Sequence, residues 1–157
     1  MWRSPAAGRK SHHGMYGAGV TAVTEKLARS AIEPKNPHLN ASRKSNLPHV
    51  PGIRIGDYIF LSGMVSVDPQ TGERFHGPIA NQVRTVLSNM RHMLESAGSS
   101  LQRVVRVHVI LADVSDFAEM DRVYQEFFPA DPPARMVWSM QLRFGNGCEI
   151  ECVALAG

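Results

Sequence analysis

Cysteine and long apolar segments, which mark secreted and membrane proteins, are scarce in this sequence. Cys148 and Cys152 are the only cysteines among 157 residues. In an extended strand they would share a face but lie about 13 Å apart, which is too far for a disulfide. No apolar run approaches the ~20 residues that cross a bilayer, and the first residues lack the apolar core of a secretory signal. We therefore expect a cytoplasmic protein in a reducing compartment, without a membrane partner.

The sequence also lacks the patterns that bind metals, phosphate groups or nucleic acids. It contains no Cys/His cluster with metal-ligand spacing and no glycine-rich phosphate loop. The formal net charge is +3, but Arg3, Arg9 and Lys10 all precede the first acidic residue, Glu25, and the other charges balance. A neutral domain has no basic surface to neutralise phosphates, so we expect no nucleic-acid partner.

The first part of the chain differs in composition from the rest. Residues 1–24 are rich in Gly, Ser and Ala, carry no acid and show no periodicity, which predicts a disordered extension. Acid-poor basic segments are also typical of mitochondrial targeting sequences, although the glycines and Pro5 would weaken the helix that these need. The chain has 43% hydrophobic residues, and its length suits one domain over residues 25–157.

The first half of that domain predicts a hairpin followed by a helix. Residues 53–55 and 58–61 are strand-like segments that a Gly56-Asp57 turn would join. A helix is expected from Pro78 to Gly98, because proline is tolerated in a first turn and glycine commonly follows the last one. Its buried stripe has spacings of three and four residues and contains Ile79, Val83, Val86, Leu87, Met90, Leu94 and Ala97.

The second half predicts a strand, a helix and two further strands. Residues 104–111 alternate, with one apolar face of Val105, Val107, Val109 and Leu111. Ser115-Asp116 would cap a helix whose buried stripe contains Phe117, Met120, Tyr124, Phe127 and Phe128. Strands over 134–143 and 148–156 would be joined by a turn at 144–147. This order predicts an α+β fold in which both helices pack on one face of a single sheet.

The other face of the sheet would be only partly polar. We expect it to combine charged and apolar side chains, namely Arg106, His108, Arg135 and Glu149 with Val104, Ile110 and Val137. This mixture is too apolar for solvent alone, so a second copy of the chain is the simplest cover, which predicts a closed homo-oligomer. Trp138 alternates with Arg135 along its strand and is therefore expected in the core.

Several motifs, taken in order, resemble the Rid (reactive intermediate deaminase) family over about residues 47–156. They are Gly56-Asp57 through Phe60-Leu61-Ser62-Gly63, Asp68-Pro69-Gln70-Thr71-Gly72, Gln82 and Asn89, Ala97-Gly98-Ser99-Ser100-Leu101, Asp116-Phe117 with Val123-Tyr124 and Phe127-Phe128, Pro133-Ala134-Arg135, and Glu149-Ile150-Glu151. The resemblance implies a chorismate-mutase-like α+β fold and a homotrimer with active sites between subunits. It also implies hydrolytic deamination of 2-imino acids and their enamine tautomers, such as 2-aminoacrylate, without a metal or cofactor.

The resemblance further implies which residues do the chemistry. Arg135 would bind the substrate carboxylate, because the planar fork of arginine suits two parallel hydrogen bonds. Glu149 would orient or deprotonate the attacking water. From strand alternation alone, Arg135 could instead form a structural ion pair with Glu149 or Glu151.

Four more residues are candidates for substrate binding. Ser62 and Gly63 match the Ser-Gly of the family at the end of the second strand, where a serine also serves as an ordinary strand-end cap. His49 stands where the family has a tyrosine and could supply a hydrogen bond or a proton. Asp121 replaces an asparagine and would repel the substrate carboxylate unless it points to solvent or to Arg122.

Altered residues near Arg135 leave the substrate open. Met136 and Trp138 replace smaller residues, which indicates a changed pocket shape. A larger enamine acid such as 2-aminomuconate is therefore an alternative substrate. A trimeric module that binds carboxylates without turnover is a third interpretation, because a fold does not fix a function.

Overall fold

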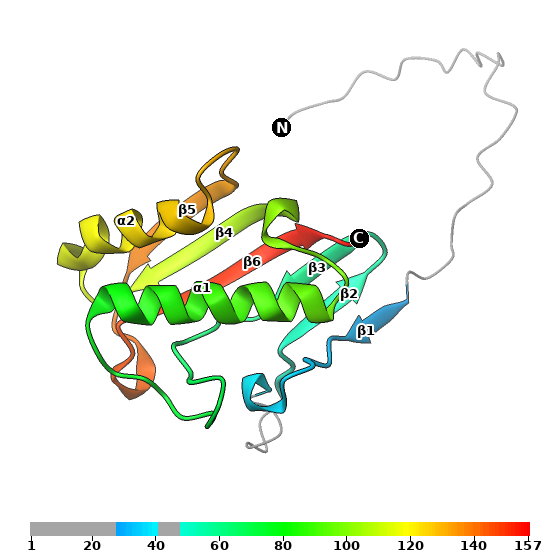
Figure 1. The fold of residues 1–157 in the computed structure, drawn as a ribbon, viewed down its shortest axis with the longest axis horizontal. Coiled ribbons are helices and arrows are strands. Elements are labelled where there is room, and N and C mark those ends of the chain that lie inside the picture. The colour runs from blue at the N-terminus through cyan, green and yellow to red at the C-terminus, as the bar shows by residue number, and fades with distance from the viewer. Residues whose placement is uncertain (1–27, 41–47) are drawn as a thin grey trace, which may run out of the picture.

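The computed structural model describes residues 28–40 and 48–157, so the extension predicted over residues 1–24 lies outside the described residues. Figure 1 shows a single sheet with two helices packed on one face. The strands are β1 (Arg29–Ala31), β2 (Gly52–Ile55), β3 (Tyr58–Leu61), β4 (Val104–Leu111), β5 (Ala134–Ser139) and β6 (Cys148–Leu155), and the helices are α1 (Ile79–Ser96) and α2 (Phe117–Phe127). The predicted α+β architecture is confirmed.

The six strands lie in the order β1-β2-β3-β6-β4-β5, and the β4–β5 pair is parallel while the other pairs are antiparallel. The chain passes from β4 through α2 to β5, and a helical crossover of this kind brings the second strand back parallel to the first. The predicted turn that would pair β5 with β6 is therefore wrong, because β4 lies between them. The connecting segment instead contains a short 3-10 helix, Arg143–Gly145.

The hairpin of β2 and β3 is confirmed, whereas the edge strand β1 was not predicted. Gly56 adopts a φ of 55° in the two-residue turn, a left-handed conformation that favours glycine. β1 has only three residues, all exposed, so no alternation of apolar and polar residues could identify it. It pairs with β2 and extends the sheet beyond the hairpin.

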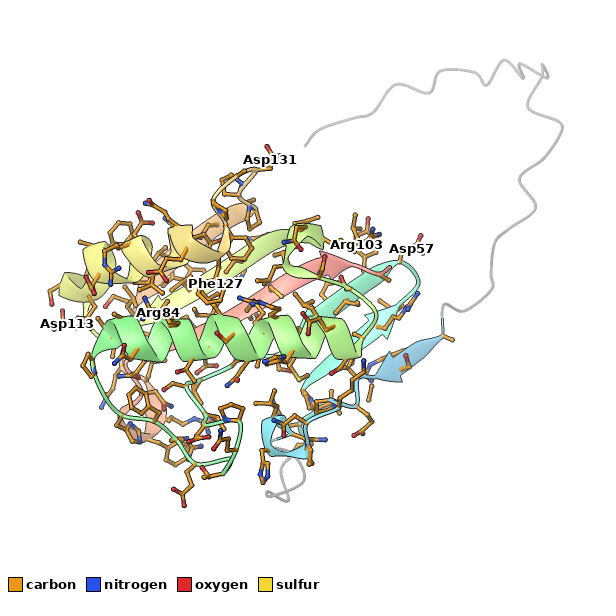
Figure 2. All side chains as sticks on the ribbon, in the orientation of Figure 1. Asp57, Arg84, Arg103, Asp113, Phe127 and Asp131 are labelled. Atoms are coloured by element: carbon orange, nitrogen blue, oxygen red, sulfur yellow. The ribbon has the colours of Figure 1, made fainter. Side chains whose placement is uncertain are left out.

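The core lies between the sheet and the two helices. The predicted stripe of α1 is confirmed, since these members are completely buried: Val83, Val86, Leu87, Met90 and Leu94. Gly98, with a φ of 75°, follows the end of the helix. Figure 2 labels Arg84 on α1, which donates to both carboxylate oxygens of Glu126 on α2 at 2.8 to 3.2 Å. This ion pair joins the two helices on their solvent side.

A bulge in β4 changes which of its residues are buried. The register with β6 shifts between Val104 and Arg106, and an extra residue in one strand interrupts the alternation of faces. Val104 is therefore buried and Val105 is 42% exposed, which is the reverse of the prediction. From Val107 to Leu111 the alternation is as predicted.

The start of α2 also differs from the prediction. A 3-10 turn, Val114–Asp116, precedes the helix. The side chain of Asp113 caps this turn by accepting a hydrogen bond of 2.8 Å from the backbone N–H of Ser115. Asp116 stands at the N-cap position of α2, as predicted, but its side chain forms no capping hydrogen bond. Met120 and Tyr124 are buried as predicted, while Phe117 is 43% exposed. No helix in residues 28–40 and 48–157 is long and apolar enough to span a membrane.

The sheet face away from the helices carries exposed aromatic side chains. Trp138 is 49% exposed, and its ring centroid lies 5.4 Å from that of His108. The prediction that Trp138 packs in the core is wrong, because β5 pairs it with Ile110 on the face that the helices do not cover. Tyr58 and Phe60 of β3 are 50% and 40% exposed on the same face.

Candidate functional site

Glu149 and Gly63 meet near one end of the sheet. Gly63 follows β3, and the next residue, Met64, exchanges two backbone hydrogen bonds of 2.9 Å with Ile150 of β6. A β-carbon on residue 63 would collide with the Glu149 carboxylate, so a larger residue at this position would displace that side chain. The carboxylate of Glu149 has no hydrogen bond or ion pair in the part of the chain that the structure describes. Its oxygens are therefore free to accept bonds from water.

Ser62 connects this pair to the loop that contains His49. The Ser62 hydroxyl donates to the carbonyl of Val50 at 2.7 Å, and its backbone N–H donates to the carbonyl of Pro51 at 2.9 Å. The hydroxyl proton is thus engaged in a structural hydrogen bond, as expected of a strand-end serine. The hydroxyl oxygen can still accept a hydrogen bond from a ligand. His49 is exposed and lies one residue before the carbonyl that Ser62 binds.

Arg135 lies against α2, on the helix-covered face of the sheet. Its Nη2 is 2.6 Å from Oδ1 of Asp121, and the two side chains are 23% and 27% exposed. The guanidinium carbon lies 4.5 Å from the ring centroid of Tyr124 and 6.0 Å from that of Phe117. An ion pair and ring stacking therefore hold the guanidinium in one orientation, and its other N–H groups remain open to a ligand.

Asp121 is a fixed anion beside Arg135. Gln125, one turn further along α2, donates its Nε2 to Oδ2 of Asp121 at 2.9 Å. The hydrogen bond from Arg135 holds the pKa of Asp121 below its usual range, so this side chain is ionised at neutral pH. Neither expected orientation, toward solvent or toward Arg122, is found, since Arg122 pairs with Glu119 at 2.8 Å.

Tyr124 supports the guanidinium of Arg135 from the core side. Burial raises the pKa of Tyr124 to about 12, so its ring stays neutral and presents a π face to the cation. The sequence placed Tyr124 in a buried stripe and in a family motif, without a role beside Arg135, and did not identify Gln125 at all. The spacing of four residues from Asp121 to Gln125, which puts both on one helix face, is the signal that could have identified it.

Arg135 and Glu149 are too far apart for one small substrate to contact both within a single chain. Arg135 is in register with Val107, which faces the helices, whereas Glu149 is in register with Ile110 on the other face. Two strand spacings of about 4.8 Å and three residue rises of about 3.3 Å put their Cα atoms roughly 14 Å apart. The prediction that Arg135 lies on the uncovered face is wrong, because alternation shows which residues share a face but not which face is covered.

A polar row lies beside Glu149 on the uncovered face. Arg106 donates its Nε to Nε2 of His108 at 2.8 Å, and Nδ1 of His108 is 2.6 Å from Oε1 of Glu151. Glu151 is therefore bound to His108, and the alternative ion pair of Arg135 with Glu149 or Glu151 is wrong. Among the described residues, no three His, Cys, Asp or Glu side chains are arranged to hold a metal ion.

Comparisons with known proteins find relatives over most of the chain. The family described as endoribonuclease L-PSP matches residues 40–156. A RutC family protein of Pyrococcus abyssi is 44% identical over 109 residues, which are 69% of this chain and 85% of the relative. The human protein named 2-iminobutanoate/2-iminopropanoate deaminase is 32% identical over 111 residues, or 70% of this chain and 81% of that protein. The solved structure of the yeast protein YEO7 matches with a TM-score of 0.75 at 30% identity, covering 83% of this chain and 100% of that one.

Proposed function

The chain belongs to the endoribonuclease L-PSP (Rid) family, and we propose that it hydrolyses reactive 2-imino acids and their enamine tautomers to 2-oxo acids and ammonia. A relative at 32% identity is named for this reaction on 2-iminobutanoate and 2-iminopropanoate. The observation that carries the proposal is the Glu149 carboxylate, which lies against Gly63 and has no cationic partner in the described residues. A carboxylate that is not already bound to a cation can accept a hydrogen bond and then a proton from water, as a general base must.

The reaction needs one group that activates water and one that binds the substrate carboxylate. Water adds through its oxygen to C2 of the imine, the C2–N bond then breaks, and the nitrogen leaves as ammonia with the protons that the water supplied. Glu149 accepts a proton from the attacking water and returns it to the departing nitrogen. Arg135 binds the C1 carboxylate and thereby orients C2 toward the water, since collision in solution supplies no orientation.

In the proposed site, Arg135 comes from one copy of the chain and Glu149 from its neighbour in a homotrimer. Two features support this arrangement. The two residues lie on opposite faces of the sheet in one chain, and the uncovered face exposes Trp138, Tyr58 and Phe60, which suits a subunit contact. In such a trimer, the edge strand β5 of one subunit, which carries Arg135, would lie next to Glu149 of the neighbouring subunit.

Ser62, Gly63 and His49 complete the proposed site on the Glu149 side. The backbone at Gly63 passes directly beside the Glu149 carboxylate, and Gly63 and the preceding Ser62 would face the substrate. The exposed imidazole of His49 is placed near the same strand end by the bond from Ser62 to Val50. A histidine there can donate a hydrogen bond or a proton to the substrate or the leaving group.

The charge of the described residues favours a small substrate over RNA, although the family description names an endoribonuclease. Acidic side chains outnumber Lys and Arg in residues 28–40 and 48–157. Cleavage of RNA would require a surface that neutralises several phosphates. Incubating the same protein preparation with RNA and measuring strand cleavage is therefore a necessary control for every activity assay.

A larger enamine acid with a second carboxylate is the other candidate substrate. The guanidinium carbons of Arg74 and Arg143 lie 4.3 Å and 5.8 Å from the ring centroid of Phe144, which is 64% exposed. Neither arginine forms a salt bridge with a carboxylate among the described residues. Arg74 and Arg143 could therefore bind the second carboxylate of a long substrate.

The test is a coupled assay in which a pyridoxal-phosphate dehydratase generates 2-iminobutanoate in the presence of the full-length protein. The proposal predicts that the imine disappears faster and ammonia forms, and that Arg135→Ala and Glu149→Gln each reduce the rate by about 10²-fold or more. An unchanged imine lifetime would refute the proposal. Activity on a long dicarboxylate alone would select the larger substrate, and binding of 2-oxobutanoate without turnover would indicate a non-catalytic module.

A further inference from the structure

Asp121 places a negative charge beside the group that is proposed to bind the substrate carboxylate. Its Oδ1 lies 2.6 Å from Nη2 of Arg135, and both side chains remain about a quarter exposed to solvent. A purely carboxylate ligand would be attracted by Arg135 and repelled by Asp121 at almost the same place. A site for a simple 2-oxo acid would gain nothing from this aspartate.

Both members of the pair keep free hydrogen-bonding capacity. A guanidinium has five N–H donors, and the ion pair with Asp121 uses Nη2. A carboxylate can accept about four bonds, and Asp121 accepts one bond from Arg135 and one from Gln125. A ligand can therefore donate to Asp121 and accept from Arg135 without breaking the bond between them.

The neighbouring positive and negative charges of Arg135 and Asp121 are complementary to a ligand that carries a negative and a positive group on adjacent carbons. A protonated 2-imino acid has this form, with a carboxylate at C1 and an iminium, C=NH2+, at C2. The 2-oxo acid product keeps the carboxylate and replaces the iminium by a neutral carbonyl. The ligand charge opposite Asp121 is thus present before the reaction and absent after it.

We propose that Asp121 and Arg135 act together as a zwitterion-binding pair, with Arg135 on the carboxylate and Asp121 accepting a hydrogen bond from the iminium nitrogen. This inference rests on the proposed deaminase function. In the reaction the oxygen of water bonds to C2, the C2–N bond breaks with its electron pair going to nitrogen, and both water protons leave with that nitrogen as ammonium. Asp121 therefore favours binding of the substrate and release of the product.

The competing explanation is that Asp121 only positions Arg135. Stacking on Tyr124 already orients the guanidinium, and Gln125 holds Asp121 from the other side. A positioning role predicts that loss of the aspartate charge weakens every carboxylate ligand. The zwitterion-binding pair predicts opposite effects on two ligands that differ only at C2.

The experiment is titration calorimetry of the full chain with 2-aminobutanoate and 2-oxobutanoate, which share a carbon skeleton. The ammonium of the first compound stands in for the iminium. Asp121→Asn keeps the side-chain size but removes the charge. We expect it to weaken 2-aminobutanoate binding about tenfold, the loss of one charge-assisted hydrogen bond, and to tighten 2-oxobutanoate binding several-fold.

Glu119→Gln is the matched control, because Glu119 is also an α2 acid in an arginine ion pair, but with Arg122. It should change neither affinity. Equal shifts of both ligands in Asp121→Asn, or no binding of 2-aminobutanoate by the unmodified protein, would overturn the proposal. Turnover of iminobutanoate is measured separately, so failure of the deaminase function would appear as absent turnover, whatever the two affinities show.

Discussion

The Glu149 carboxylate occupies the space that a β-carbon on residue 63 would fill. Gly63→Ala should therefore push this carboxylate away from its position while leaving the exposed backbone at residue 63 intact. We expect kcat to fall about tenfold or more, because small displacements of a general base cost much of its effect, and KM to change little. Steady-state kinetics of imine hydrolysis measure both constants.

Gly98→Ala is the matched control for that substitution. Gly98 has a φ of 75°, but a β-carbon there would meet nothing within 4 Å. The variant should lose about 1 kcal/mol of stability through backbone strain and keep its kcat. An equal loss of activity in both variants would mean that Gly63→Ala acts through the fold rather than through Glu149.

Arg135→Lys should impair substrate binding although it keeps the positive charge. Lysine cannot form two parallel hydrogen bonds to a carboxylate, and its compact ammonium loses the flat contact of the guanidinium with Tyr124. We expect KM to rise about tenfold or more in the coupled assay. Arg91→Lys is the control, because Arg91 lies 5.2 Å from the ring centroid of Phe127 on the solvent side of the helices, and it should leave KM unchanged.

The features of the fold and of the candidate site that sequence alone could identify are the local ones. Gly56 and Gly98 stand where a turn and a helix end need left-handed backbone, and both were predicted and found. Pro133-Ala134-Arg135 and Glu149 were identified from motifs. Each of these signals resides in a few neighbouring residues.

The parts that failed depend on how distant segments pack. Periodicity separated the two faces of β5 but did not show that α2 would cover the face with Arg135 rather than the face with Trp138. The contact of Arg135 with Asp121 exists only because α2 lies across β5 after the crossover. The bulge that buries Val104 likewise arises from pairing with β6.

Alkaline pH should destabilise the protein through its buried thiols. Burial raises the pKa of Cys148 and of Cys152 to about 12, from near 9 in an unfolded chain. Between these values the unfolded chain loses protons that the folded chain retains, so the free energy of unfolding falls as pH rises above about 9. Thermal melts from pH 7 to 10.5 should show a falling Tm.

The variant Cys148→Ala/Cys152→Ala isolates this effect. It should be less stable at pH 7 by about 1–2 kcal/mol, because the shorter side chains leave space in the core. Its Tm should then decline less steeply above pH 9 than that of the unmodified protein. An identical slope in both proteins would show that the thiols do not cause the alkaline loss.

Trp138→Glu should dissociate the proposed trimer. Trp138 is 49% exposed beside His108 on the uncovered face, where a new carboxylate would add to the charges of Glu149 and Glu151. Light scattering after gel filtration should show the mass falling from about three chains of 17.3 kDa to one. Val114→Glu, at a residue that is 69% exposed in the turn before α2, should leave the mass unchanged. A Trp138→Glu variant of unchanged mass would argue against a contact at this face.

The most direct test of the central claim, an active site with Arg135 from one chain and Glu149 from the next, is subunit mixing. Arg135→Ala and Glu149→Gln proteins, each inactive alone, are unfolded together in equal amounts and refolded. In randomly mixed trimers, roughly a quarter of the shared sites contain both native residues, so about a quarter of the unmodified rate should return. A mixture that stays inactive, although light scattering shows trimers of both chains, would contradict the account, because it would place Arg135 and Glu149 in the same site of one chain or outside the site altogether.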